Sequence, residues 1–328
     1  MIIILTNKDD VTVDFIVREL RNQKIDYYRL NTEDIPTDID LIFSIDNNVF
    51  SLHDKNKDET LDLKKVTAVY FRRAIVSHLS ELIDVSVSEK NYLRGELTYI
   101  LEGLYKILRH KYWLNNIYAI REAENKIYQL QVAQEIGFTI PQTVLSNVPI
   151  VVEDMANKCE YDCIIKPIKS GYFKDYAKSK IIFTSKLDCN VLADKSRIQS
   201  FPVFVQKHIN KLFDLRCIVV GNMVYCAQID SQANLDSQVD WRRGKENLHH
   251  SIHELPMEIA DKCIKMTKKM GLNYSAIDLI LNKNNEYIFL ECNPNGQWAW
   301  LEVRLGFTIS KSIVELLKKG YRDVTENF

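Results

Sequence analysis

Residues 278–304 constrain the fold of this chain more than any other stretch. Two apolar runs flank a polar turn at residues 282–286, and this pattern predicts a β-hairpin. Asp278 begins the first strand, while Glu291 and Asn293 end the second, so an antiparallel hairpin brings the three together. Because Glu291 and Asn293 are two residues apart, their side chains point to the same face.

These three side chains offer hard oxygen ligands, two of them charged. Mg²⁺ prefers such a partial cage and completes its coordination with water and phosphate oxygens. We therefore predict that Asp278, Glu291 and Asn293 are metal ligands. The alternative is a hairpin that meets solvent at polar residues.

The composition is that of a globular enzyme with two or three lobes. The chain has 328 residues, of which 46% are hydrophobic and 27% charged, so it can bury a large core. Its net charge of -1 gives no bulk electrostatic basis for binding nucleic acid or membranes. The apolar N-terminus lacks the basic segment of a signal peptide, and no apolar run reaches transmembrane length. Seven scattered cysteines favour reduced thiols in a cytoplasmic protein.

The N-terminal part alternates short apolar runs with helical periodicity, which predicts an α/β fold. No Gly-rich turn follows the first predicted strand, so a dinucleotide-binding fold lacks its main requirement. The predicted strands here are residues 2–5, 25–30, 41–45 and 66–71, and the predicted helices are residues 11–22 and 92–108.

The rest of the chain mixes helices and strands around two polar insertions. One is a loop at residues 169–178 that contains Gly171, and the other is an excursion at residues 230–254. The predicted helices are residues 123–137, 151–158, 256–270 and 309–318, and the predicted strands are residues 163–166, 181–184, 202–209, 215–220 and 223–229, with another beginning at Pro141.

Two lysines are candidates for contacting phosphate. Lys126 lies early in a predicted helix, and Lys166 ends an apolar strand, from which its ammonium group can reach into a cleft. The loop at 169–178 could cover phosphates with backbone N–H donors. The alternative for both lysines is an ordinary surface position.

The strand at residues 202–209 becomes polar at its end, where its backbone could hydrogen-bond an adenine edge beside Ile209. A plain edge strand is the alternative. Asp214 and Arg216 share a face of the next strand, and Arg216 offers a fork of donors for phosphate or carboxylate. The alternative for this second pair is a mutual surface ion pair.

The order of these residues resembles that of the ATP-grasp ligases, from Trp113 to the C-terminus. The resemblance implies an ATP-grasp fold of the mixed α/β (α+β) class, with an N-terminal α/β lobe at 1–115, a central lobe at 116–200 and a C-terminal lobe at 201–328. The two later lobes would grip ATP. It implies the following contacts: Lys126 and Lys166 with phosphates, Gln206, Lys207 and Ile209 with adenine, Asp214 with ribose, and Asp278, Glu291 and Asn293 with Mg²⁺.

A narrower resemblance is to the ATP-grasp peptide maturases that make microviridins and other graspetides. The motifs that carry it are Tyr70-Phe-Arg-Arg73, Trp113-Leu-Asn115, Ala123-Glu-Asn-Lys126, Asp240-Trp-Arg242 and Asn293-Pro-Asn-Gly-Gln-Trp-Ala-Trp-Leu-Glu302. The resemblance implies a ribosomal precursor peptide as partner and macrocyclic esters or amides as products. The alternative for Trp298 and Trp300 is core packing. The family also favours a homodimer.

One position departs from some ligases of the superfamily, which carry an arginine two residues before the metal aspartate. Ala276 stands there in this chain, so Arg216 becomes the candidate for neutralising the transferred phosphoryl group, with Lys166 as the second catalytic candidate. The excursion at 230–254 is basic and aromatic, which favours a peptide-facing surface. A metal site at His249 and His253 is the less favoured alternative.

The predicted activity is thus activation of a peptide carboxylate by ATP, followed by ring closure. An ATP-grasp ligase that adds a free amino acid to a carboxylate is the first alternative. A non-catalytic nucleotide-binding module is the second.

Overall fold

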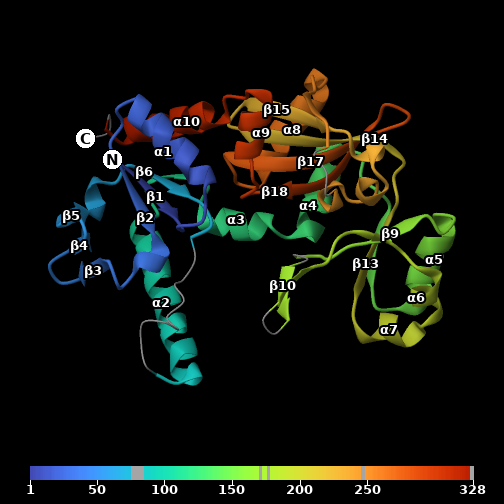
Figure 1. Cartoon of the computed structure of the whole chain (residues 1–328), viewed down its shortest axis with the longest axis horizontal. Coiled ribbons are helices and arrows are strands. Elements are labelled where there is room, and N and C mark those ends of the chain that lie inside the picture. The colour runs from blue at the N-terminus through green and yellow to red at the C-terminus, as the bar shows by residue number, and fades with distance from the viewer. Residues whose placement is uncertain (75–84, 170–171, 176–177, 245–247, 326–328) are drawn as a thin grey trace.

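A computed structural model describes residues 1–74, 85–169, 172–175, 178–244 and 248–325. The N-terminal sheet and the central lobe lie at opposite ends of the molecule, with the C-terminal lobe between them along one side (Figure 1). The helices and several sheets confirm the predicted mixed α/β (α+β) class. The exact lobe boundaries stay a prediction.

The N-terminal lobe has a parallel four-stranded sheet in the order β2-β1-β6-β7 and an antiparallel three-stranded sheet, β3-β4-β5. The antiparallel sheet was only partly predicted, since β4 and β5 are short polar strands. Long α2 begins at a capping box between Ser86 and Glu89 and projects away from the body (Figure 1). The elements of this lobe are β1 (Ile2–Thr6), α1 (Thr12–Asn22), β2 (Tyr27–Asn31), β3 (Ile39–Ser44), β4 (Val49–Asp54), β5 (Glu59–Asp62), β6 (Ala68–Phe71), α2 (Val87–Ile107) and β7 (Tyr112–Leu114).

Two short helices lead into the central lobe, where one helix was predicted at residues 123–137. Asn125 divides them, because its side chain accepts from the backbone N–H groups of Ile127 and Tyr128 and caps the second helix. Gly137, at a φ of 88°, ends that helix. The two helices are α3 (Ile117–Ala123) and α4 (Lys126–Ile136).

The central lobe has a four-stranded sheet in the order β12-β9-β13-β8. The predicted polar loop at 169–178 is largely the hairpin β10-β11, and Gly171 lies outside the described residues. The predicted strand at 181–184 is wrong, since β11 ends at its first residue and β12 follows it. The elements are β8 (Thr143–Ser146), α5 (Pro149–Lys158), β9 (Cys163–Ile165), β10 (Tyr172–Asp175), β11 (Lys178–Ile181), β12 (Ser185–Lys186), α6 (Cys189–Ala193), α7 (Lys195–Ser200) and β13 (Val203–Lys207).

The C-terminal lobe has a five-stranded antiparallel sheet in the order β16-β15-β14-β17-β18, so the predicted hairpin is confirmed. Its first strand begins at Tyr274, so Asp278 lies within the strand and not at its start as predicted. The described part of the excursion holds three short 3-10 helices. The elements are β14 (Lys211–Val220), β15 (Met223–Ile229), η3 (Ser231–Ala233), η4 (Leu235–Ser237), η5 (Trp241–Arg243), β16 (His250–Ile252), α8 (Met257–Lys269), β17 (Tyr274–Asn282), β18 (Tyr287–Asn293), α9 (Ala299–Leu305) and α10 (Ile309–Thr325).

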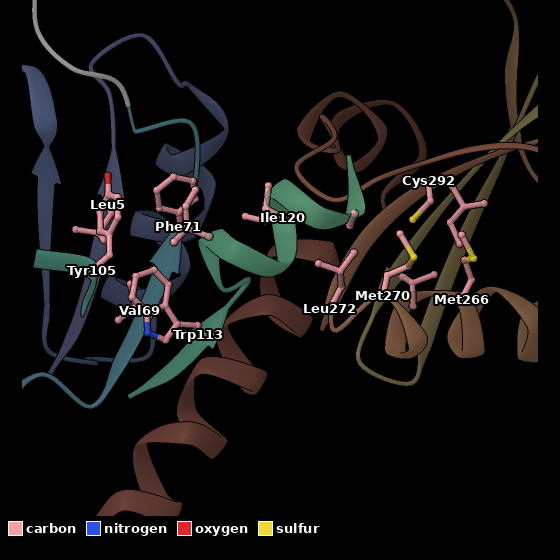
Figure 2. Close-up of a cluster of buried hydrophobic side chains, with 14 of the residues drawn as sticks. Leu5, Val69, Phe71, Tyr105, Trp113, Ile120, Met266, Met270, Leu272 and Cys292 are labelled. Carbon is pink, nitrogen blue, oxygen red and sulfur yellow. The ribbon is translucent and has the colours of Figure 1, made fainter. Parts of the chain in front are cut away.

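Two hydrophobic cores cross from the N-terminal lobe to the C-terminal lobe. In the first, Phe71 and Trp113 belong to the same cluster as Met270 and Leu272, and Ile120 of α3 lies between the two groups (Figure 2). The second contains Ile4 of β1, Trp298 and residues of α10. The central lobe has a smaller core of its own. The two outer lobes are therefore packed against each other through shared apolar side chains.

Candidate active site

A cleft of about 660 Å³ lies between the central lobe and the C-terminal sheet. Its walls include nearly every side chain that the sequence singled out as functional. Strands β9 and β13 supply one wall, and β14, β17 and β18 supply the other. The predicted site residues that line it are Lys126, Lys166, Gln206, Lys207, Ile209, Asp214, Asp278, Glu291 and Asn293.

Asp278 and Glu291 face each other directly across the β17-β18 ladder, and Asn293 stands opposite Ala276 two pairs further along. Directly opposed residues, and residues two apart, share one face of a sheet, so all three candidate metal ligands project from the same face. Each carboxylate already has a cationic partner. Arg216 Nη1 lies 2.8 Å from Asp278 Oδ1, and Lys126 Nζ lies 3.1 Å from Glu291 Oε2.

The donor set fits Mg²⁺ rather than a softer metal. In the part of the chain that the structure describes, no three His, Cys, Asp or Glu side chains cluster as a metal site. Two carboxylates and the Asn293 amide provide a partial oxygen shell, which suits a cation that keeps water or phosphate ligands. Asp278, Glu291 and Asn293 are therefore the residues that would hold it.

The two carboxylates have opposite protonation tendencies. Burial raises the pKa of Asp278 to about 6, with the Glu291 charge adding to it and the Arg216 charge opposing it. Burial would also raise the pKa of Glu291, but Lys126, Lys166 and Arg242 outweigh it and lower that pKa to about 2. Glu291 is thus a permanent anion, while the charge of Asp278 depends on its neighbours.

The two candidate phosphate lysines lie in the same cleft. Lys126 is the first residue of α4, and its ammonium group donates to the carbonyl of Pro167 at 3.2 Å as well as pairing with Glu291. Lys166 follows β9 and lies 5.2 Å from the centre of the Phe204 ring. Burial lowers the pKa of Lys166 to about 8, although the Glu291 charge works against this. Lysines in such positions can lose hydration water and contact phosphate directly.

The candidate adenine and ribose residues surround the far side of the cleft. Gln206 is fully buried and donates to Thr143 Oγ1 at 2.8 Å, while its side-chain oxygen has no protein partner among the described residues. Lys207 ends β13, and Ile209 follows in the segment that joins the two lobes. Asp214 forms a buried ion pair with Lys211, at 2.7 Å, rather than with Arg216. The mutual Asp214–Arg216 ion pair weighed above is therefore wrong.

Arg216 is held deep in the site. It is 7% exposed, it donates to both oxygens of Asp278, and its Nη2 lies 3.4 Å from the carbonyl of Gln297. Its charge is thus matched by a candidate metal ligand. Any catalytic role must start from this pair, because Arg216 is not a free guanidinium in the cleft.

Two further groups in the site were not assigned from the sequence. Gln129 of α4 clamps Cys292 between the two ligands of β18, donating to its carbonyl at 2.7 Å and accepting from its N–H at 2.9 Å. Arg242 lines the cleft and is gripped by buried Asp240 at 2.7 and 2.8 Å. The Asp240-Trp-Arg242 motif was a signal for the second group, while nothing in the sequence marks Gln129.

The excursion residues divide between structure and surface. Residues 250–252 form β16, so His249 and His253 do not share a helix face. His253 instead lies 3.0 Å from Tyr287 Oη. Trp298 is fully buried in the second core, which is the packing alternative. Trp300 is half-buried and lies against Trp241 and His250, with ring centres 5.9 and 5.1 Å apart.

A cleft between two lobes that is lined by two lysines and two opposed carboxylates fits the ATP-grasp fold predicted from the sequence. The chain belongs to the RimK-like ATP-grasp family, whose model matches residues 123–317. The model of the MvdD pre-ATP grasp domain matches residues 1–121. The family assignment confirms the predicted enzyme class.

Two curated relatives match about two thirds of the chain. A probable alpha-L-glutamate ligase of Pectobacterium carotovorum subsp. carotovorum (strain PC1) is 23% identical over 215 residues, which is 64% of this chain and 67% of that protein. A protein of the same name from Chromohalobacter salexigens is 25% identical over 216 residues, covering 64% and 68%.

Solved structures match the whole chain. Macrocyclase MdnC of Microcystis aeruginosa MRC, bound with precursor peptide MdnA, superposes with a TM-score of 0.84 at 28% identity, covering 97% of this chain and 99% of that one. A RiPP-associated ATP-grasp ligase of Chryseobacterium gregarium, in complex with ADP and a leader and core peptide, gives a TM-score of 0.86 at 26% identity, covering 97% and 96%. Helices of the described residues lack the combination of length and hydropathy needed to cross a bilayer.

Proposed function

We propose that this enzyme uses ATP to activate side-chain carboxylates of a ribosomal precursor peptide and closes macrocyclic ester or amide links. The observation that carries the proposal is the full-length likeness to a macrocyclase bound with its precursor, N-terminal lobe included. The probable alpha-L-glutamate ligases match 64% of the chain, whereas the macrocyclase covers 97% of it and residues 1–121 match the MvdD pre-ATP grasp domain. The shared ATP machinery alone would not distinguish these reactions, but the N-terminal lobe does.

The chemistry has two steps. A peptide carboxylate attacks the γ-phosphorus of ATP, the bond to the bridging oxygen breaks, and ADP leaves with an acyl phosphate formed. A Ser or Thr hydroxyl or a Lys amine then attacks the acyl carbon, loses its proton, and expels phosphate. Because a carboxylate has no good leaving group, the first step supplies one. The enzyme contributes positioning and charge neutralisation.

The cleft residues suit this division of labour. Lys126 and Lys166 present positive charge to the phosphates, and Arg216 keeps Asp278 ionised by pairing with it. Mg²⁺, held by Asp278, Glu291 and Asn293, would neutralise phosphate charge when bound. Gln206, Lys207 and Ile209 line the space proposed for adenine, and Asp214, which lines the same cleft, is proposed to bind a ribose hydroxyl. The buried and unsatisfied oxygen of Gln206 supports a polar ligand there.

The direct test is reconstitution with a candidate precursor. A small reading frame rich in Thr and Glu beside the gene would supply the peptide. The purified enzyme, ATP and Mg²⁺ should convert it to products that have lost one water mass per ring, with one ADP released for each. Unchanged peptide mass in the presence of ADP release would overturn the macrocyclase assignment.

A second candidate is a ligase that adds a free amino acid to a peptide carboxylate. The curated relatives named probable alpha-L-glutamate ligase favour it. The same mass spectra decide, because this reaction adds an amino-acid residue to the peptide instead of removing water. A non-catalytic nucleotide-binding module would release no ADP with any peptide. The homodimer and the cytoplasmic location stay predictions.

A further inference from the structure

The turn that follows the candidate metal ligands is held from the N-terminal lobe. Arg72 and Asp10 lie at the carboxyl ends of β6 and β1, where the parallel sheet faces this turn. Their side chains are 1% exposed, and Arg72 Nε lies 2.8 Å from Asp10 Oδ2. In open α/β sheets this edge usually faces a ligand. Here it faces the protein's own residues 293–297.

Arg72 uses its remaining donors on that turn. Its Nη1 donates to the carbonyl of Gly296 at 3.2 Å, and its Nη2 donates to Gln297 Oε1 at 2.8 Å. Thr12 Oγ1 donates to the same Gln297 oxygen at 2.5 Å. The Arg72 guanidinium therefore holds the turn through one backbone and one side-chain acceptor. Tyr274 Oη also donates to the Gly296 carbonyl, at 2.7 Å, and Asn115 Nδ2 donates to the Pro294 carbonyl at 3.0 Å. Of these three side chains, only Arg72 reaches Gln297 as well as Gly296.

The 293–297 turn packs directly against the catalytic cleft. A β-carbon added at Gly296 would lie 2.6 Å from Arg216 Nη2 and 2.5 Å from the Ala276 side chain, so Gly296 has no room to shift inward. Arg216 also donates to the carbonyl of Gln297. Displacing the turn would disturb both Asn293 at its start and the Arg216–Asp278 pair behind it.

A buried ion pair is a poor device for stability alone, since apolar side chains of similar volume often serve as well or better. What the Arg72 guanidinium adds is direction, because its donors reach three acceptors on two lobes. The shared hydrophobic cores bring the lobes together but do not fix a backbone turn. The geometry therefore requires another explanation for why charge is buried here.

We propose that Arg72 is a positioning residue for catalysis. It fixes the 293–297 turn from the N-terminal lobe and thereby sets Asn293 and the Arg216–Asp278 pair for nucleotide and metal. The inference rests on the proposed function only in treating the cleft as the Mg²⁺-nucleotide site. It assigns the N-terminal lobe a part in the chemistry besides any contact with substrate.

The test uses Arg72→Lys, Gln297→Leu and Gln297→Glu in the full chain. Lysine keeps a charge for Asp10 but cannot span Gly296 and Gln297 together. Gln297→Leu removes the acceptor, while Arg72 keeps its ion pair with Asp10. Gln297→Glu keeps an acceptor oxygen at this position. We expect Arg72→Lys and Gln297→Leu to raise the Mg²⁺ concentration needed for ADP binding by about tenfold, as is typical when support for a metal ligand is lost. Gln297→Glu should need the same Mg²⁺ concentration for ADP binding as the wild type.

Calorimetry with ADP at a series of Mg²⁺ concentrations gives the readout, and ADP binding without Mg²⁺ should change little. Arg29→Lys is the matched control, because Arg29 lies in the same sheet and pairs with exposed Asp14. Thermal melts identify a variant that fails to fold, and Gln297→Leu keeps the test decisive if Arg72→Lys does. Wild-type Mg²⁺ dependence in folded Gln297→Leu would overturn the inference. Failure of the wild-type enzyme to cyclise the precursor peptide would overturn only the proposed function.

Discussion

At the scale of single residues, the cleft pairs each of the two candidate metal-binding acids with a base. Asp278 is paired with Arg216, and Glu291 with Lys126. Removing one member of a buried pair leaves the other uncompensated, which costs more than the pair contributes. To bind a divalent cation, the two carboxylates must therefore exchange their cationic side-chain partners for the metal. Metal binding then depends on the charge state of each acid.

Neutral, isosteric substitutions test the two acids. We expect Asp278→Asn and Glu291→Gln to lower ATP turnover by about a hundredfold or more, because each removes a charged oxygen ligand and leaves its cationic partner without its counter-charge. Peptide-dependent ADP release measures the loss, and thermal melts check folding. Glu286→Gln is the control, since Glu286 lies in the turn of the same hairpin and bonds Asn282 away from the cleft. Normal turnover by either acid variant would rule out the metal assignment.

The pH dependence of nucleotide binding belongs to Lys166. Its pKa is lowered by burial to about 8, so the free enzyme loses this charge as pH rises through that value. Phosphate favours the charged form. ADP affinity should thus be flat between the pKa of Asp278, about 6, and that of Lys166, about 8, and should fall above about pH 8 by at most about tenfold per unit because one proton is involved. Calorimetry over this range should show a flat profile for Lys166→Arg, and an equally steep fall in that variant would contradict the assignment.

The sequence could predict most of this residue set but not its pairings. Asp278, Glu291 and Asn293 were predictable because a hairpin fixes which side chains meet. Arg216 and Asp214 share a face, yet each pairs with a residue on its other side, Asp278 and Lys211. Lys211 lies three residues before Asp214 on the same strand, whereas the Arg216 pairing depends on which strand lies alongside β14, which no local pattern encodes. Gln129 was not predictable for the same reason.

At the scale of elements, strong periodicity and turn chemistry predicted what local physics decides. Helix α8 and the β14-β15 hairpin lie close to their predicted positions. The predicted helix at 123–137 was wrong in one respect, because Asn125 competes for backbone N–H groups and starts a new helix. The short helices α6, α7 and α9 were missed, since they have too few turns for an apolar stripe to show.

Gly320 shows how one element depends on a distant one. It lies in α10, and a β-carbon there would come within 2.2 Å of the Tyr112 ring on β7. The glycine thus allows the last helix to approach the edge of the N-terminal sheet. Gly95 in α2 has nothing within 4 Å of the same position. Replacing each of these helical glycines by alanine should therefore change stability in opposite directions.

We expect Gly320→Ala to destabilise the protein by about 1–3 kcal/mol, because an atom is forced into a packed interface. Gly95→Ala should stabilise it by about 1 kcal/mol, since alanine is the better helix former. Urea unfolding curves measure both. If the two variants shift stability in the same direction, the close approach of α10 to β7 is not what Gly320 serves.

At the scale of the whole molecule, the chain is not three independent lobes. Both large cores contain side chains from the N-terminal and C-terminal lobes, and α10 contacts α1, β6, β7 and β14. The central lobe has a separate core around Val152 and Val205. The N-terminal and C-terminal lobes thus form one packed unit, and the central lobe is joined to it with a core of its own.

The shared cores make a prediction about fragments. Expressed alone, residues 1–121 would expose the inner faces of β1, β6 and α3, which the full chain covers with α10 and the C-terminal sheet. Because burial of apolar surface is the main term that stabilises a domain, neither this fragment nor residues 122–328 should fold cooperatively alone. Circular dichroism melts and ADP calorimetry on each fragment, and on the two mixed, measure this.

Mixing the fragments is the informative arm, because association should restore a cooperative melt and ADP binding together if the lobes fold as one unit. The positioning role of Arg72 requires the same result, since the 293–297 turn has its anchors in the N-terminal fragment. A fragment of residues 122–328 that melts cooperatively and binds ADP with the Mg²⁺ dependence of the full chain would show that the C-terminal lobe builds its site alone. The N-terminal lobe would then contribute nothing to the geometry of the nucleotide site.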